Sequence, residues 1–447
     1  MRIAYFSPLN PLKTGVADYS EELLPELAKH VDIDIYITNF EPTSQVIKQK
    51  FKFFSINSFN EEKYKYYDEV IYHIGNNTEF HKDIYLTALK FPGIVVIHDY
   101  SIHHLIANLT VGKGDWEGYI NEMKYNYGEE GEHFARLSAQ GKMRVMWESD
   151  RTLEYPANRR LLECSRGAIV HSYMAEESLK TVKPNQFIQY APLFATNIES
   201  IRHEQKLELR KKYNISENAV VFSSFGFVSK AKRIESVLKA LKKLSPEKEV
   251  VYLVVGQEEE GAHEISNLIK QLKLDNICRH VGFVSLEEFK EYIMLSDVCI
   301  NLRYPTQGET SASLLRILGY GKPALVSDIG SFSEFPDNFT IKISCGDEQK
   351  EINEIAEALD RFLKDENLAS VMGLEALSYV ERHHTVSETS ASYIKAIQML
   401  HAFKAFGGEA RYYYGYLDRY FEKVGDIISL SEENKRNFSE KLSEFFR

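Results

Sequence analysis

Several features that would assign a protein to a specialised class are scarce in this sequence. Only four cysteines occur in 447 residues, and no two of them form a CxxC pair. They are Cys164, Cys278, Cys299 and Cys345. This pattern argues against a disulfide scaffold or a zinc knuckle and indicates reduced thiols in a cytosolic compartment. Because no run of about 18 apolar residues is present, we expect no membrane-spanning helix.

The sequence also lacks an excess of positive charge. Its 54 Lys and Arg residues are outnumbered by 65 Asp and Glu residues, which gives a formal net charge of -11. This balance argues against nucleic-acid binding through a broadly basic surface. With 44% hydrophobic and 27% charged residues the composition is that of a globular protein, and the length predicts two or three domains. The N-terminal MRIAYFSPLN passes from a short apolar run into a turn, so we expect no signal peptide.

Short apolar runs rich in β-branched residues alternate with longer helical patterns along most of the chain. This alternation predicts an α/β fold of βαβ units, with parallel sheets buried on both faces. The first set of predicted strands comprises residues 3–6, 33–37, 51–56, 70–74, 94–97, 168–170 and 187–190. The second set comprises residues 220–226, 250–255, 277–283, 298–301, 324–327 and 339–343. Each set predicts one doubly wound, Rossmann-like domain.

We place the domain boundary in the polar segment 194–214, between the two sets of strands. The predicted N-terminal domain spans residues 1–195 and carries a helical insertion at about 100–166, where no convincing strand occurs. The C-terminal domain is expected at 196–384, and residues 385–447 are expected to form helices that cross back to the N-terminal domain. Aromatic residues recur in that tail at helical spacing, which is typical of a packing face. They are Tyr412, Tyr413, Tyr416, Tyr420 and Phe421.

Two such domains facing each other create a cleft, because open α/β sheets bind ligands beyond the carboxyl ends of their strands. The loop after the first strand reads SPLNPLKTGVADYS and contains a single glycine. It therefore lacks the G-x-G-x-x-G pattern of dinucleotide-binding domains, and the sequence contains no Walker A loop.

The most informative loop follows the predicted strand at 298–301. It contains Gly308, Glu309, Thr310 and Ser311 and leads into an amphipathic helix. Either Thr310 or Ser311 can cap this helix, whose first N–H groups and positive dipole end favour a phosphate ligand. A capped helix between two strands, with no ligand, explains the same pattern, because Glu is common near N-caps.

The segment RYPTQGETSASLLRILGYGKPALVSD resembles the retaining GT-B glycosyltransferases of family 4, and the resemblance covers the chain to about Leu400. That family usually reads E-G-F-G, then a second Glu, then G-K-P, and the G-K-P element matches here at 321–323. A gapless alignment puts Gly308 and Arg316 at the two Glu positions. The resemblance implies that Glu309, one residue later, contacts the transferred sugar. Arg316 either faces the donor diphosphate or is a structural helix residue.

The segment SFGFVSKAKRIESVLKAL resembles the family's strand-loop-helix element that binds the donor phosphates. Lys232 matches the phosphate-binding lysine, Phe227 replaces the usual Arg, and Arg233 is a candidate to supply the missing cation. A cation at a strand end can neutralise a leaving diphosphate, although a solvated basic helix start has the same pattern. Gly282 and Phe283, in HVGFV, match a strand end that borders the nucleotide base.

The resemblance extends to the N-terminal domain. Gly15 matches a glycine that either lets the backbone approach the donor and acceptor or adopts a positive φ. His98, after the strand GIVVI, matches a histidine near the sugar and can donate a hydrogen bond to the donor sugar or the acceptor. Together with His103 and His104 it also raises a metal cluster as an alternative, without a confirming spacing. The residues expected on the acceptor side are Tyr72, Asn76, Asn77 and His81.

The resemblance implies transfer of a sugar from a nucleotide-diphosphate donor to an acceptor hydroxyl, with retention at the anomeric carbon, in polysaccharide or glycoconjugate synthesis. The implied acceptor is a sugar, a lipid-linked sugar or a protein-linked glycan, and neither a metal nor another cofactor is expected. Because the leaving phosphate can take the acceptor proton, no protein nucleophile is required.

Two other functions fit the same fold. The replacements at Phe227 and Arg316 suggest a non-catalytic sugar-nucleotide-binding subunit, and a sugar-nucleotide epimerase would share the donor site. We expect a cytoplasmic protein that binds no nucleic acid. Basic helix faces at 206–212 and 239–243 permit peripheral contact with the inner face of the membrane, but short basic faces are usually only solvated.

Overall fold

The N-terminal part of the molecule is built around one parallel sheet. The structure, a computed structural model, describes residues 1–244, 248–258 and 265–405. Seven strands lie in the order β3-β2-β1-β4-β5-β6-β7. They are β1 (Arg2–Phe6), β2 (Asp32–Ile37), β3 (Lys52–Ser55), β4 (Glu69–Ile74), β5 (Ile94–Ile97), β6 (Gly167–Val170) and β7 (Phe187–Tyr190). The strands inside the sheet are mostly buried and apolar, as strands covered by helices on both faces must be, whereas the edge strand β3 is partly exposed.

The second parallel sheet has six strands, in the order β10-β9-β8-β11-β12-β13. They are β8 (Val220–Phe225), β9 (Val250–Val255), β10 (Cys278–Gly282), β11 (Val298–Asn301), β12 (Ala324–Ser327) and β13 (Thr340–Ile343). Every strand predicted from the sequence is present, with ends that differ by a residue or so. The prediction of an α/β fold with two doubly wound sheets is therefore confirmed.

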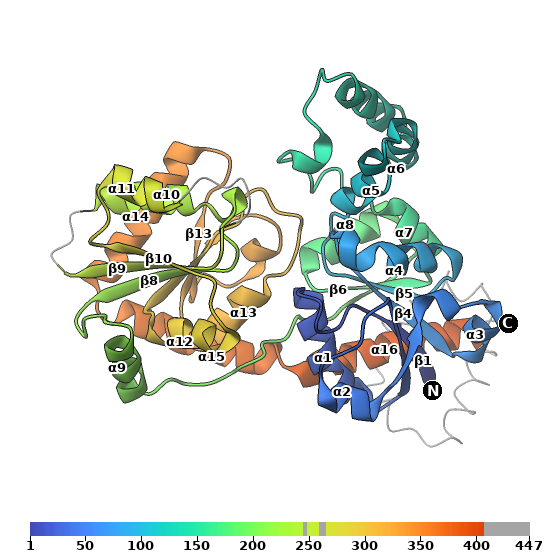
Figure 1. Ribbon diagram of the computed structural model, residues 1–447, viewed down its shortest axis with the longest axis horizontal. Coiled ribbons are helices and arrows are strands. Elements are labelled where there is room, and N and C mark those ends of the chain that lie inside the picture. Colours follow the sequence, from blue (N-terminus) through green and yellow to red (C-terminus); the bar gives the residue numbers. More distant parts are fainter. Residues whose placement is uncertain (245–247, 259–264, 406–447) are drawn as a thin grey trace.

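Helices cover both sheets (Figure 1). Those of the first domain are α1 (Gly15–Leu27), α2 (Gln45–Lys50), α3 (Glu61–Tyr66), α4 (Thr78–Lys90), α7 (Arg159–Cys164) and α8 (Tyr173–Val182), with the short 3-10 turn η1 (Ile56–Ser58). Those of the second are α9 (His203–Lys212), α10 (Ile234–Lys243), α11 (Ile265–Leu272), α12 (Leu286–Leu295), α13 (Ala312–Gly319), α14 (Glu348–Lys364) and α15 (Leu368–His383), with η4 (Lys230–Lys232) and η5 (Gly330–Glu334).

A helical insertion projects from the first domain between β5 and β6, at the top of Figure 1. It consists of α5 (His103–Leu109), η2 (Val111–Lys113), α6 (Trp116–Ala139) and η3 (Met146–Glu148). It has a small core of its own, in which Tyr119, Met123 and Met146 are buried. The insertion is therefore a packed unit beside the cleft.

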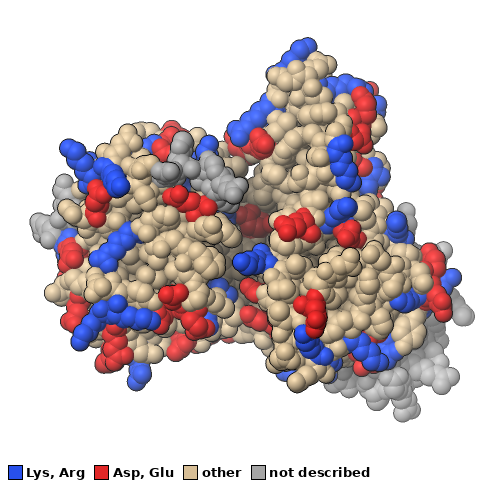
Figure 2. All heavy atoms as spheres, in the orientation of Figure 1, with Lys and Arg blue, Asp and Glu red and all other residues tan. Residues whose placement is uncertain are grey.

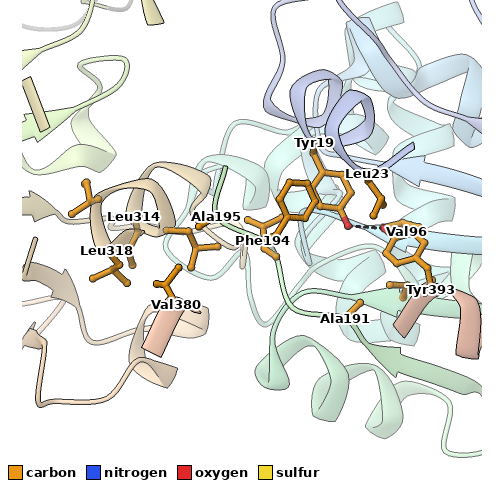
Figure 3. Packing of buried hydrophobic residues seen from close by; sticks show 14 of the residues in the cluster. Tyr19, Leu23, Val96, Ala191, Phe194, Ala195, Leu314, Leu318, Val380 and Tyr393 are labelled. Atoms are coloured by element: carbon orange, nitrogen blue, oxygen red, sulfur yellow. Dashed lines mark hydrogen bonds between the residues drawn. The ribbon is translucent and has the colours of Figure 1, made fainter. Parts of the chain in front are cut away.

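The two domains are joined by continuous apolar packing. The last described helix, α16 (Val386–Ala405), packs against α1 of the first domain. There the Tyr19 hydroxyl donates to that of Tyr393 at 2.9 Å, and Phe194 stacks on the Tyr19 ring (Figure 3). The same buried cluster continues through Ala195 to Leu314 in the second domain. Burial of apolar surface thus holds the connection between the domains.

Part of the predicted C-terminal extension cannot be compared with the structure. The aromatic residues predicted to form a packing face, Tyr412 to Phe421, lie outside the described residues. Among the residues that are described, none of the helices combines the length and apolar character needed to cross a bilayer.

The strand orders locate the place where a ligand is expected. In the first sheet the order reverses between β1 and β4, and in the second between β8 and β11. Open α/β sheets bind ligands at such points, beyond the carboxyl ends of the strands. The candidate site therefore lies between the loops that follow these four strands, and Figure 2 shows the surface hollowed between the two domains.

Candidate active site

The loop after β11 docks directly on the N-terminal domain. The Ser101 N–H donates to the carbonyl of Gln307 at 2.8 Å, and the Thr152 hydroxyl donates to the carbonyl of Thr306 at 2.8 Å. Gly308 has φ +73°, and a Cβ at this position would lie 2.6 Å from Cβ of Tyr100. Glycine is thus required here both by the backbone conformation and by the close approach of the two domains. The contact of Gly308 is with the facing domain, and its predicted role in donor binding stays a prediction.

Glu309 is held within its own loop. Its Oε1 lies 2.9 Å from Nε of Arg303, and its Oε2 accepts hydrogen bonds from the Thr306 hydroxyl at 2.7 Å and the Gln307 N–H at 2.8 Å. A carboxylate that accepts two hydrogen bonds and forms one ion pair is well fixed. Its side chain is 20% exposed, so it stays accessible at the cleft, and its predicted contact with the transferred sugar remains a prediction.

Ser311, and not Thr310, caps α13. Its hydroxyl accepts from the Leu314 N–H at 3.2 Å, whereas the Thr310 hydroxyl donates to the His171 carbonyl of the other domain at 3.0 Å. Of the two capping residues that the sequence allowed, one caps the helix and the other joins the domains. The positive end of α13 therefore lies beside the cleft, where it favours an anion.

Two cations after β8 have different surroundings. Lys232 is 8% exposed, and a Cβ at Gly226 would lie 3.5 Å from its Nζ, so the ammonium group sits against the strand end. Arg233 instead points to α14, where Nε and Nη2 donate to the buried carboxylate of Glu351 at 2.8–3.1 Å. Because this ion pair already balances its charge, we no longer expect Arg233 to replace a phosphate-binding cation.

Exposed aromatic side chains follow β8 and β10, which lie on either side of β9 in the second sheet. Phe227 follows β8 and is 60% exposed, and Phe283 follows β10 and is 71% exposed. Gly282 has φ +83°, and the space where its Cβ would lie is open. This part of the edge is accessible to a planar, partly apolar group such as a nucleobase.

Arg316 faces the linker and the first domain. Its Nη2 donates to the Thr196 hydroxyl at 3.3 Å, and its guanidinium lies 5.7 Å from the centre of the Phe289 ring. It also lies near Glu22 of α1, whose pKa burial raises to about 7 in spite of the attraction to Arg316. Of the two roles that the sequence left open, these contacts favour the structural one.

Three histidines meet on the N-terminal side of the cleft. His73 belongs to β4, and His98 and His171 are the first residues after β5 and β6. Nδ1 of His73 lies 2.9 Å from Nε2 of His98, and the rings of His98 and His171 are 4.9 Å apart. Burial lowers the pKa of all three, that of His171 to about 4. They are therefore neutral imidazoles near pH 7.

The geometry of these histidines is that of a hydrogen bond. Two imidazole nitrogens on one tetrahedral zinc ion, each about 2.1 Å from it, would be about 3.4 Å apart. Within the described ranges, no group of three or more His, Cys, Asp or Glu side chains is arranged to hold a metal. His103 is engaged otherwise, since its ring nitrogens contact the Tyr155 carbonyl at 2.6 Å and the Tyr119 hydroxyl at 2.8 Å.

Asn76 and Asp99 join the insertion to both domains. Oδ2 of Asp99 accepts from the Asn76 N–H at 2.7 Å, and the Asn76 amide nitrogen lies 3.2 Å from Nδ1 of His104 and 3.4 Å from Oε1 of Gln307. Burial, followed by repulsion from Glu309 across the cleft, raises the pKa of Asp99 to about 6. The predicted acceptor residue Asn76 therefore does lie where the insertion meets the cleft.

Two of the other predicted acceptor residues are misplaced. Tyr72 is fully buried in the core of the first domain, and its hydroxyl donates to the Phe91 carbonyl at 2.8 Å. His81 is 2% exposed, and its Nδ1 contacts the His73 carbonyl at 3.1 Å. Neither side chain can reach an acceptor, because Tyr72 reaches the segment before β5 and His81 lies against the backbone of β4. Asn77 is exposed and caps α4 through the Glu79 N–H at 2.9 Å.

Gly15 begins α1 with a φ outside the left-handed region, so a positive φ does not explain the glycine. A Cβ at this position would meet nothing within 4 Å. The space above it is open, and the alternative role, close approach of a ligand to the backbone, stays a prediction.

Three residues that shape the site were not predicted from the sequence. His171 follows the apolar strand GAIV just as His98 follows GIVVI, and this shared pattern is a signal that was available. His73 lies inside a strand, where a single histidine is usually a core residue. Glu334 of η5 accepts from the N–H groups of Tyr173 and Met174, at 3.0 and 2.7 Å, and so caps α8 of the opposite domain. We find no local pattern that predicts this contact.

The chain is similar to known proteins in sequence and in fold. Residues 205–377 match the family model described as glycosyl transferases group 1. Over 209 residues the chain is 26% identical to N-acetyl-alpha-D-glucosaminyl L-malate synthase of Bacillus anthracis, a match that covers 47% of this chain and 52% of that protein. The chain thus spans about half the length of this curated relative.

Solved structures resemble nearly the whole chain. Sucrose-phosphate synthase from Thermosynechococcus elongatus superimposes with a TM-score of 0.62, at 16% identity, over 90% of this chain and 99% of that one. HepE of Anabaena in complex with UDP-glucose superimposes with a TM-score of 0.61, at 13% identity, over 89% and 100%. The chain therefore has the GT-B fold, and residues 205–377 of its C-terminal domain are similar to glycosyl transferases group 1.

Proposed function

We propose that this protein is a retaining glycosyltransferase of family 4, which moves a sugar from a nucleotide-diphosphate donor to an acceptor hydroxyl in polysaccharide or glycoconjugate synthesis. The observation that carries the proposal is the meeting of two strand-end edges at one cleft. Lys232 and the positive end of α13 stand on one side, and His98 stands on the other. The curated relative is named as a glucosaminyl malate synthase, and HepE holds UDP-glucose, which supports a nucleotide-sugar donor.

The chemistry demands stabilisation of a leaving group. Departure of a diphosphate leaves negative charge on its oxygens and an oxocarbenium-like sugar, so fixed cations and N–H dipoles at the leaving group lower the barrier. Lys232 and the N-terminus of α13 suit this task. The leaving phosphate takes the proton of the acceptor hydroxyl, so that none of the side chains at the cleft has to act as a nucleophile.

We assign the donor to the C-terminal edge and the acceptor to the N-terminal edge. The exposed rings of Phe227 and Phe283 provide an accessible surface for the base. Asn76 and His104, where the insertion meets the cleft, provide hydrogen-bonding groups for a polar acceptor. The contacts of the loop after β11 with the first domain support a closed state that keeps water from the sugar.

The first test is a thermal-shift panel of UDP, GDP, dTDP, ADP and CMP. A ligand that binds only the folded protein raises its stability by RT ln(1 + [L]/Kd), about 2.7 kcal/mol at a hundredfold excess over Kd. We expect one nucleoside diphosphate to raise the melting temperature more than the others do. Sugars linked to that nucleotide are then tested with acceptor extracts, and the anomeric configuration of the product is read by NMR.

Four outcomes would contradict the proposal in different ways. If none of the nucleotides binds, the donor site is absent. If one binds but no sugar is transferred with any extract, the protein is a non-catalytic binding subunit. If the donor sugar is epimerised without an acceptor, the protein is an epimerase. An inverted product would refute retention alone.

A further inference from the structure

The contact between His73 and His98 requires one of two proton arrangements. Nδ1 of His73 lies 2.9 Å from Nε2 of His98, so one of these nitrogens donates to the other. In the first arrangement His73 donates from Nδ1, and its Nε2 carries a lone pair. In the second His98 donates from Nε2, and neutral His73 must then carry its proton on Nε2.

The surroundings of His73 select the first arrangement. Its Nε2 is completely buried and has no hydrogen-bond partner in the part of the chain that the structure describes. The ring lies against the aromatic rings of Tyr5 and Tyr393, with centres 4.5 and 6.2 Å away. A buried N–H without an acceptor is rarer and less favourable than a buried lone pair without a donor. The proton of His73 therefore belongs on Nδ1, in the bond to His98.

His171 cannot supply a competing donor. Its Nδ1 contacts the carbonyl oxygen of Ala191 at 2.9 Å, and a carbonyl only accepts, so Nδ1 carries the proton of neutral His171. Its Nε2 is a lone pair, buried and without a partner among the described residues. Consequently the ring beside His98 has no N–H to offer it.

The other groups that face His98 do not favour a charge on it. The Tyr19 ring of α1 packs edge-on against it, with centres 5.1 Å apart, and its hydroxyl donates to that of Tyr393. Burial, followed by the proximity of His171, His73 and His81, lowers the pKa of His98 well below its usual value. Asp99, next in the chain, is the nearest acid in sequence, and its own pKa is raised to about 6.

We propose that His73 is a positioning residue, which accepts no proton itself but fixes His98 as the neutral tautomer with its proton on Nδ1. His98 is partly exposed at the cleft, and its Nδ1 has no partner among the described residues, so this N–H is offered to a bound molecule. His98 then acts as a hydrogen-bond donor to an oxygen of the substrate and not as a base. The role of this N–H in sugar transfer rests on the proposed function. The assignment of the His98 tautomer does not depend on that function.

The test uses the full-length protein labelled with ¹⁵N in its histidine rings and no ligand. Long-range ¹H–¹⁵N spectra distinguish protonated from unprotonated ring nitrogens, and a His98→Gln variant assigns the signals of His98. In the wild type we expect one form of His98, with Nδ1 protonated and Nε2 unprotonated from pH 6 to pH 8. A wild-type His98 that is protonated on Nε2 overturns the inference at once.

Three variants then test the role of His73. His73→Phe keeps an aromatic ring but removes the donor, so we expect His98 to show a mixture of the two tautomers. His73→Asn places an amide N–H near the position of Nδ1 and should restore the single form. His384→Asn is the matched control, because His384 is also buried and bonded through Nδ1, to the Leu193 carbonyl, and it should leave His98 unchanged. An unchanged His98 tautomer in folded His73→Phe overturns the inference.

The kinetic consequence is measured with the nucleotide sugar that the ligand panel identifies. His73→Phe should lower kcat about threefold to tenfold with little change in the donor KM, as expected for loss of one neutral hydrogen bond in the transition state. His73→Asn should recover most of this loss. Full activity in His73→Phe overturns the assignment of a donor role to His98. Conversely, the expected spectra together with a failure to turn over any sugar nucleotide refute the proposed function and leave the tautomer assignment standing.

Discussion

The two sides of the cleft are built from opposite chemistry. On the N-terminal side the strand ends carry neutral, largely buried rings, of which His73, His98 and His171 are the central ones. On the C-terminal side the strand ends carry charged groups, among which Arg233 is paired with Glu351 and Arg303 with Glu309. A charged edge suits a diphosphate, and a neutral edge suits hydroxyl groups. The site therefore stabilises the charge of the diphosphate on one side of the cleft and recognises hydroxyl groups by hydrogen bonds on the other.

The largest effect is expected from the charged side. Lys232→Ala should lower turnover about 10²- to 10³-fold, because it removes a positive charge at the developing diphosphate. Steady-state kinetics with the identified donor measure the loss, and a melting curve checks that the fold is kept.

Lys230→Ala is the matched control, since Lys230 lies on the same 3-10 turn and is exposed. It should be nearly as active as the wild type. If Lys232→Ala retains wild-type kinetics, the phosphate role of Lys232 is wrong. The charged side of the cleft would then not be the side that stabilises the diphosphate.

Glu309→Gln is expected to have the next largest effect. The amide keeps an acceptor for the Thr306 hydroxyl and the Gln307 N–H, but Arg303 loses its counter-charge at 2.9 Å. We expect kcat to fall about tenfold while the nucleotide Kd, measured by calorimetry, changes less than about threefold. Glu287→Gln, at an acid that is 79% exposed, serves as the control. Loss of nucleotide affinity alone would place Glu309 at the nucleotide and not at the sugar.

The charged side was the more predictable of the two from sequence. The cap at Ser311 depends on local chain geometry, which short motifs describe, whereas the need for glycine at Gly308 comes partly from Tyr100 of the facing domain. The strands were all located because apolar runs of this length are a strong signal. Arg233 was misjudged since its partner, Glu351, lies on a distant helix that no local pattern identifies.

The neutral side was less predictable because it depends on strand register. His73 pairs with Val96, and the next residue, Ile74, pairs with Ile97, so that His98 follows one step beyond and its ring reaches back to that of His73. A sequence contains the two histidines but neither the order nor the register of their strands. The same reason explains Tyr72, which lies one residue before His73 and so points to the opposite face of the sheet, into the core.

A smaller effect is expected where the two sides meet. Glu334→Ala removes the acceptor of the Tyr173 and Met174 N–H groups and so uncaps α8 from across the cleft. Loss of a cap weakens a helix end by about 1 kcal/mol, so we expect the equilibrium between closed and open domains to shift several-fold toward open. Small-angle scattering should show a larger radius of gyration, and the donor KM should rise several-fold. Glu177→Ala, at an exposed acid of α8, is the control and should change neither the radius of gyration nor the donor KM. An unaltered scattering curve for Glu334→Ala would show that this cap does not hold the domains closed.

The smallest effect concerns Asp99, the acid beside the neutral edge. Burial and Glu309 raise its pKa from 3.8 to about 6, so between these pH values the unfolded chain releases a proton that the folded protein retains. Stability is therefore lost as pH rises from about 4 to about 6, and the full cost is present above that range.

Asp99→Asn keeps an oxygen for the Asn76 N–H and removes the charge. Urea unfolding should then show a gain of about 1 kcal/mol at pH 8, a value reduced for the partial exposure of Asp99, and none at pH 4. An equal gain at both pH values would mean that the charge of Asp99 does not cause the loss of stability. The N-terminal side of the cleft would then accommodate a buried charge at little cost.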